Sequence, residues 1–132
     1  MTNYNVHNKS PRHSFANFGV WKEGHKLVLL IYKLTKKFPK EELFALVPQM
    51  RRAAVSVTSN IAEGYGRSSQ KDKIHFYFIA RGSLTELENQ TLISKDIGYI
   101  SEGEFGETYE KILEVSRLLN SFIKNARSYV AS

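Results

Sequence analysis

Apolar residues recur every three or four positions in four separate stretches of the chain, which is the spacing of one face of an α-helix. The expected helices cover residues 20–38, 48–65, 70–97 and 101–129. Phe38-Pro39 ends the first, since the residue before proline disfavours helical geometry. Ser101 and Glu104 have the spacing of a capping box at the start of the fourth. No stretch alternates with the period of a strand. The pattern predicts an all-α fold, an antiparallel up-down four-helix bundle.

The domain organisation follows from the same pattern. Residues 1–16 are polar and lack a period, so we expect a flexible N-terminal extension followed by a bundle domain over residues 17–132. No apolar run is long enough to span a bilayer, and the first 14 residues lack the apolar core of a signal peptide. The chain contains no cysteine, which excludes disulfides and thiolate metal sites. We therefore expect a cytoplasmic protein without a membrane partner.

The fourth helix carries more apolar residues than one buried face requires. Besides an expected inner face through Ile112, Ser116 and Leu119, it has a second stripe. The stripe consists of Val115, Leu118, Phe122 and Tyr129. The third helix likewise has Phe78, Leu92 and Ile93 outside its inner face. Because spare apolar surface indicates a further interface, the pattern predicts a homo-oligomer that buries the stripe.

Positive charge gathers in the first part of the chain. Residues 1–81 hold 14 Lys and Arg against 5 Asp and Glu, a net charge of +9, whereas residues 82–132 have a net charge of −3. Five lysines fall in one arc of the first helix, opposite its apolar face. They are Lys22, Lys26, Lys33, Lys36 and Lys37. One interpretation is a solvated face that serves solubility; the other is a surface that contacts the phosphates of a nucleic acid.

The second helix carries two adjacent arginines and a polar row. Arg51 and Arg52 are suited to phosphate contact because a guanidinium offers a planar fork of donors, and they are equally suited to pairing with nearby carboxylates. We expect a polar contact between the second and third helices. Its expected members are Asn60, Glu63, Ser83, Glu86 and Glu88.

The residues give little support to catalysis. The four histidines lack the spacing of metal ligands. Glu63, Glu86 and Glu88 are better explained as partners of arginine than as acid–base groups. The glycines at 64 and 66 lack the ending of a phosphate-binding loop and follow a helix instead of a strand, so a helix stop is the better interpretation. We expect no catalytic residues, no metal and no cofactor.

Several motifs together resemble one bacterial family. They are Phe18-Gly19-Val20-Trp21, residues 38–43, residues 49–56, residues 59–64, residues 79–88 and Gly98-Tyr99-Ile100. Over residues 17–126 the chain resembles the 23S ribosomal RNA intervening-sequence protein family, also called S23. Many members have alanine at the position of Gly24 and proline at that of Thr58, so this sequence departs from the family twice.

The resemblance implies a four-helix bundle and a link to RNA. The family includes reading frames carried in insertions within ribosomal RNA genes. Related accessory proteins of diversity-generating retroelements form pentameric barrels that contact a reverse transcriptase and RNA. The resemblance thus implies a non-enzymatic homo-oligomer, a pentamer, that associates with RNA and with a reverse transcriptase or another protein. The alternative is a scaffold that binds protein only.

Overall fold

The protein is described by a computed structural model over residues 14–131; residues 1–13 and Ser132 lie outside the described residues. The elements are η1 (Phe15–Asn17), α1 (Gly19–Thr35), η2 (Lys40–Glu42), α2 (Leu46–Tyr65), α3 (Gln70–Ile97) and α4 (Glu102–Ala131). The predicted helices are all present, and the described residues contain no strand. The all-α fold class is confirmed, although α1 ends three residues earlier than expected.

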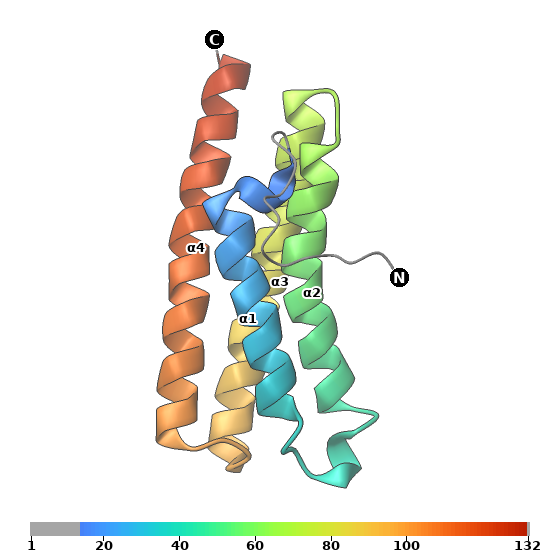
Figure 1. Ribbon diagram of the computed structural model, residues 1–132, viewed down its shortest axis with the longest axis vertical. Helices are drawn as coiled ribbons and strands as arrows, with labels where there is room; N and C mark the ends of the chain where they lie inside the picture. The colour runs from blue at the N-terminus through green and yellow to red at the C-terminus, as the bar shows by residue number, and fades with distance from the viewer. Residues whose placement is uncertain (1–13, 132) are drawn as a thin grey trace.

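The four long helices pack side by side, and each runs opposite to the one before it (Figure 1). Helices adjacent in sequence contact each other, and α1 also packs against α4, which closes the square. With this up-down topology, the start of α1, the end of α2, the start of α3 and the end of α4 meet at one end of the bundle, where the C-terminus lies (Figure 1). The turn η2 lies at the opposite end.

The core runs along the bundle axis and is lined by all four helices. Its fully buried side chains include Leu27, Ile31, Met50, Ile61, Leu87, Ile112, Val115, Leu119 and Ile123. The position of Val115 corrects the sequence analysis, because this residue is 0% exposed within its own chain and is not available to a second copy. The predicted inner residue Ser116 is only partly buried. The reason is that α4 packs against both α1 and α3, which buries a face wider than one narrow stripe.

Local hydrogen bonds fix where the helices begin and end. The predicted capping box is confirmed: the Ser101 amide donates to Glu104 Oε1 at 2.8 Å, and the Glu104 amide donates to Ser101 Oγ at 3.1 Å. Ser69 Oγ caps α3 by accepting from the Asp72 amide at 3.1 Å. Gly98 stops α3 in the left-handed conformation, with φ of 96°, which glycine adopts without strain. These caps hold both short connections of α3 in place.

The two departures from the family pattern lie against each other. Gly24 of α1 is buried, and a Cβ atom at this position would lie 3.0 Å from Thr58 Cγ2 on α2. That distance is tighter than ordinary van der Waals contact, so the branched side chain of Thr58 uses the space that an alanine at position 24 would need. The glycine and the threonine therefore fit as a pair, and α1 and α2 still pack closely.

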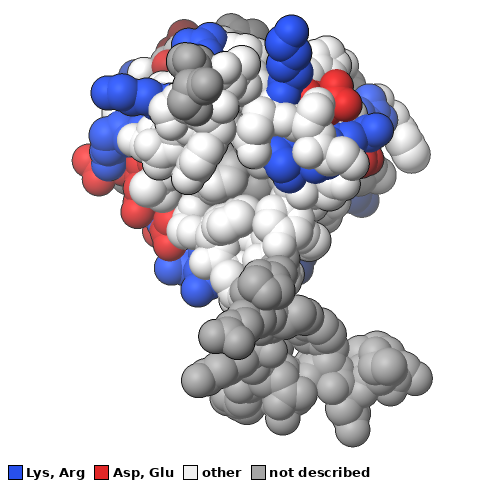
Figure 2. Space-filling view, turned by 90° about the horizontal axis from the view of Figure 1, so that it is seen from above, with Lys and Arg blue, Asp and Glu red and all other residues white. Residues whose placement is uncertain are grey.

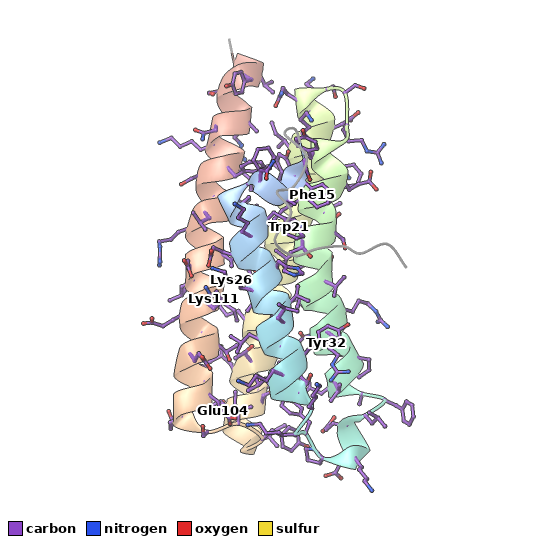
Figure 3. All side chains as sticks on the ribbon, viewed as in Figure 1. Phe15, Trp21, Lys26, Tyr32, Glu104 and Lys111 are labelled. Carbon is purple, nitrogen blue, oxygen red and sulfur yellow. The ribbon has the colours of Figure 1, made fainter. Side chains whose placement is uncertain are left out.

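The folded domain begins slightly earlier than expected. Residues 14–16 were assigned to the flexible extension, but Phe15 lies in η1 and its ring packs edge-on against Trp21 at 5.4 Å between centroids. Figure 3 shows Phe15 and Trp21 beside each other near the start of α1. The remainder of the expected extension, residues 1–13, lies outside the described residues. Within residues 14–131, no helix combines the length and the apolar character needed to cross a membrane.

Candidate nucleic-acid interface

The five lysines, three on α1 and two just after its end, are all exposed, but they are not equally free. The ammonium groups of Lys22, Lys33 and Lys36 form no hydrogen bond or ion pair with any described residue, whereas Lys26 pairs with Glu23 at 3.1 Å and Lys37 pairs with Glu104 of α4. Lys22 and Lys36 are 14 positions apart, about 21 Å at the helical rise of 1.5 Å per residue. We call Lys22, Lys33 and Lys36 the lysine face. It offers cations that no carboxylate neutralises.

Glu23 joins α1 to α4. It accepts hydrogen bonds from Lys26 of its own helix and from Lys111 of α4, the latter at 2.8 Å. Figure 3 shows Lys26 and Lys111 close together where these helices meet. The hydrogen bond from Lys111, and then that from Lys26, lowers the pKa of Glu23. Lys111 also donates to Glu114 at 2.8 Å, and this bond and the bond to Glu23 raise the pKa of Lys111. These lysines serve the fold.

We expect Glu23→Gln to lower the free energy of unfolding by about 1 kcal/mol at neutral pH, since the variant keeps the shape but loses the charge of a partly buried ion pair. The folded-state pKa of Glu23 is lowered, so its contribution is present above the ordinary value of 4.5 and is lost as the pH falls through the lowered pKa. Chemical denaturation at pH 7 and pH 3 measures both effects. The exposed Glu63→Gln is the matched control, and equal stability of both variants at pH 7 contradicts this role of Glu23.

The arginines of α2 lie beside a groove next to the lysine face. This groove, which we call the α1–α2 groove, has a volume of about 360 Å³. It is lined by Tyr32, Leu43, Val47, Pro48, Arg51, Arg52 and Val55. Arg51 donates from Nε to Thr35 Oγ1 at 2.9 Å, and its guanidinium lies 4.6 Å from the centre of the Tyr32 ring. Figure 3 shows Tyr32 on the α2 side of α1.

The two arginines therefore have different roles. Arg51 is partly buried and joins α2 to α1, so its role is structural. Its partners are Thr35 and Tyr32, and not the carboxylates that were expected. Arg52 is exposed and forms no hydrogen bond or ion pair with another described residue. It lines a hollow of about 160 Å³ together with Glu86 without pairing to it. Arg52 is thus the arginine that an incoming anion can reach.

The expected polar contact between α2 and α3 is smaller than predicted. Ser56 and Ser83 share a hydrogen bond of 2.7 Å across these helices, so Ser83 is placed correctly. Asn60 instead donates to Ser56 within α2, at 2.8 Å to its carbonyl oxygen. Glu86 lines the hollow beside this hydrogen bond, whereas Glu63 and Glu88 have partners elsewhere.

Glu63 and Glu88 have partners outside the contact between α2 and α3. Glu63 pairs with Arg67 one turn along at 3.3 Å, on the surface. Glu88 accepts from the Tyr109 hydroxyl of α4 at 2.9 Å, and this hydrogen bond raises the pKa of Tyr109. The prediction that Glu63 and Glu88 form hydrogen bonds or ion pairs between α2 and α3 is therefore wrong. Glu88 instead tethers α3 to α4.

The apolar stripe proposed for self-association is largely used within the chain. Phe122 packs against Phe18 and Tyr77, with centroid distances of 5.1 Å and 4.8 Å, and Leu118 is partly buried against the core. Phe78 of α3 is likewise covered by the guanidinium groups of Arg81 and Arg127. Of the four stripe residues, only Tyr129 is well exposed, at 71%. A second copy thus cannot use the stripe as it was predicted.

Other apolar side chains are exposed, including two directly after η2 and one on α1. Phe44 is 91% exposed, and its neighbour Leu43, which lines the α1–α2 groove, is 54% exposed. On α1, Leu29 lies one turn before Tyr32 and is 57% exposed. We call Leu29, Leu43 and Phe44 the apolar rim. The sequence contained this signal, since Leu29 interrupts the lysine arc and Leu43-Phe44 lies outside any helical period.

The exposed face of α4, which adjoins α1 through the ion pair between Lys111 and Glu23, is acidic. A shallow hollow of about 580 Å³ on α4 is lined by Glu107, Glu110, Glu114 and two basic residues. Because like charges repel, RNA is disfavoured on this side and favoured on the lysine face. Among the described residues, no cluster of His, Asp and Glu has the arrangement of a metal site.

The sequence reasoning missed an aromatic cluster at the end of the bundle where the C-terminus lies. Rings from η1, α1 and the far ends of the other helices meet there, including Phe15, Phe18, Tyr65 and Phe122. These residues are distant in sequence, but the up-down topology places their helix ends together. Aromatic residues at positions 18, 65, 77 and 122, each near a helix end, were the available signal.

Comparisons with known proteins agree with the geometry. The family described as 23S rRNA-intervening sequence protein matches residues 16–121. Among solved structures, the chain is similar to a protein of unknown function from the S23 ribosomal protein family of Bacteroides thetaiotaomicron VPI-5482. The two share 25% identity with a TM-score of 0.74, over 80% of this chain and 95% of that chain. No curated protein matches the sequence significantly.

Proposed function

The chain belongs to the 23S rRNA-intervening sequence protein family, and on that premise we propose that it is a non-enzymatic, cytoplasmic accessory protein that binds single-stranded RNA through the lysine face. The observation that carries the proposal is the set of unpaired cations, Lys22, Lys33 and Lys36, spread along one exposed side of α1. Arg52 of α2 adds a fourth beside the α1–α2 groove.

The spacing of these cations suits a phosphate backbone. Lysine is a compact charge without the geometry to distinguish bases, so contacts of this kind position a strand and do not read its sequence. Binding releases counterions from each neutralised phosphate and therefore weakens as salt increases. The test is a titration of labelled single-stranded RNA with the protein at about 50 mM and about 200 mM salt. Tight binding at low salt that weakens steeply at high salt supports the proposal, and absence of binding at low salt contradicts it.

The proposed protein acts as a homo-oligomer, a pentamer by its family resemblance, and the apolar rim supports self-association. Exposing a large apolar side chain such as Phe44 to water is unfavourable, and burial against a second copy would remove this cost. A ring of copies would repeat the lysine face and so strengthen its binding to one RNA strand.

We expect the double variant Leu43→Ser, Phe44→Ser to shift the protein to a smaller particle while its helix content stays unchanged, because neither side chain belongs to the core. Light scattering at micromolar concentration measures the particle mass, and circular dichroism measures the helix content. Ile97→Ser, which removes an exposed apolar residue at the end of α3, is the control. A wild-type protein that is already monomeric contradicts the self-association.

The alternative function is a scaffold that binds protein only, including a reverse transcriptase or another protein of the same process. The observation in its favour is the α1–α2 groove with its apolar rim, which suits a partner helix as well as a second copy. In that case the lysines serve solubility and the affinity for RNA is negligible at low salt. The RNA titration therefore separates the two functions directly.

A further inference from the structure

A pocket opens at the end of the bundle where the C-terminus lies, away from the α1–α2 groove. Its volume is about 360 Å³, near the lower end of the range for small-ligand sites. Figure 2 looks onto this end of the molecule, where uncharged residues fill the middle and Lys and Arg side chains lie toward the margin. We call this cavity the aromatic pocket. It uses the start of α1, the end of α2, the start of α3 and the end of α4.

The walls of the pocket are aromatic rings. Phe18 packs edge-on against Tyr65 at 5.4 Å and lies tilted against Phe122 at 5.1 Å. Phe122 packs edge-on against Tyr77 at 4.8 Å. Phe18 directly precedes α1, and the other rings come from α2, α3 and α4, so the packing of the whole bundle sets their geometry. Aromatic walls fixed in this way favour a flat, aromatic ligand.

Polar groups without partners also face this pocket. Tyr77 lines it and is only 3% exposed, yet its hydroxyl forms no hydrogen bond with any described residue. The side-chain amides of Gln70 and Asn125 line the same pocket and likewise form no hydrogen bond with another described residue. Polar groups that line a pocket in this way orient a ligand that carries donors and acceptors on its edge. A purely apolar ligand would leave all three groups unpaired.

The wall also contains a cation that the fold already positions. Lys73 of α3 donates from Nζ to the Tyr65 carbonyl oxygen at 2.6 Å and so caps the end of α2. Its ammonium lies 5.4 Å from the centre of the Tyr65 ring. Positive charge beside aromatic rings favours an anionic ligand with an aromatic part.

Taking the RNA-binding function as its basis, we propose that the aromatic pocket receives one unstacked nucleobase of the bound strand. A nucleobase has the flat face that the rings require and donor and acceptor groups on its edge for the tyrosine hydroxyl and the two amides. The lysine face begins next to the pocket, because Lys22 lies one helical turn after Phe18 and its amide donates to the Phe18 carbonyl oxygen. A strand that lies along α1 can therefore reach the pocket.

The experiment compares two ligands on the full chain: an eight-nucleotide single-stranded RNA and the same RNA backbone with abasic residues. Both present the same phosphates, and only the first presents bases. We expect the abasic strand to bind about 5- to 100-fold more weakly, the effect of losing one stacked base. The pocket variant combines Tyr77→Phe with Gln70→Ala and Asn125→Ala, which removes the polar groups and keeps the rings. Asn89→Ala, an exposed amide on α3, is the control.

Each outcome decides the matter. The pocket variant keeps the rings and loses the polar groups, so it should discriminate the RNA from the abasic strand less than wild type does, with its affinity for the abasic strand equal to that of wild type. Equal binding of both ligands by wild type overturns the nucleobase pocket and leaves RNA binding through the lysine face intact. A pocket variant that discriminates the ligands as well as wild type also overturns it. Binding of neither ligand at low salt removes the RNA function and the pocket proposal together.

Discussion

Replacing Gly64 with alanine is expected to destabilise the bundle by about 2–3 kcal/mol, although alanine is ordinarily the better helix residue. Gly64 lies at a close approach of α2 and α3. A Cβ atom there would lie 2.6 Å from Tyr77 Cε1 and 3.0 Å from the Lys73 carbonyl oxygen. The backbone atom cannot move without shifting α3, and the ring of Tyr77 is held by Phe122, so the added methyl group pushes the helices apart.

Gly82 gives the matched control within α3. A Cβ atom at this exposed position meets no atom within 4 Å. Gly82→Ala is therefore expected to stabilise the protein by about 1 kcal/mol, the difference in helix propensity. Denaturant unfolding of both variants measures these changes. If Gly64→Ala is as stable as Gly82→Ala, then α2 and α3 do not approach at Gly64 as described.

The helices and their ends could be predicted because they depend on neighbouring residues. The capping pair Ser101 and Glu104 and the sequence Phe38-Pro39 act within a few positions, and the apolar period acts along one helix. The width of each buried face could not be predicted in this way. Val115 and Phe122 were assigned to a second surface because a single helix does not show how many neighbours it has.

The side-chain pairings were predicted less well for a related reason. Whether Arg51 meets a carboxylate of α3 or Thr35 of α1 depends on how far each helix is rotated about its axis, which the period gives only coarsely. The aromatic pocket depends in addition on which helix ends meet. The up-down topology supplies that information. Combined with the positions of the aromatic residues, it would have predicted that Phe18, Tyr65 and Tyr77 lie at the same end of the bundle.

The largest expected effect on binding comes from neutralising the lysine face. The triple variant Lys22→Gln, Lys33→Gln, Lys36→Gln is expected to lose most RNA affinity at low salt while remaining folded, because the three side chains are exposed and have no partner among the described residues. Lys26 and Lys37 are left unchanged, since each is paired with a carboxylate: Lys26 with Glu23 of its own helix, and Lys37 with Glu104 of α4. Fluorescence anisotropy with labelled single-stranded RNA measures the loss, and circular dichroism confirms the fold.

A second triple variant removes the same charge elsewhere. Lys95→Gln, Arg117→Gln, Lys124→Gln lowers the net charge equally but lies on α3 and α4, away from the lysine face. We expect this variant to bind RNA much more tightly than the first. Equal losses in both variants indicate that net charge alone attracts RNA and that α1 has no special role.

The salt dependence of RNA binding tests the central claim most directly. The logarithm of the association constant is measured against the logarithm of the salt concentration for wild type and both triple variants. Each phosphate contact on a single strand contributes a slope of about −0.7, so loss of three lysines should make the slope shallower by about 2 per protomer. The control variant should keep the wild-type slope. A wild-type slope near zero, or the same slope in the lysine-face variant, contradicts RNA binding through α1 and leaves the protein-only scaffold as the function.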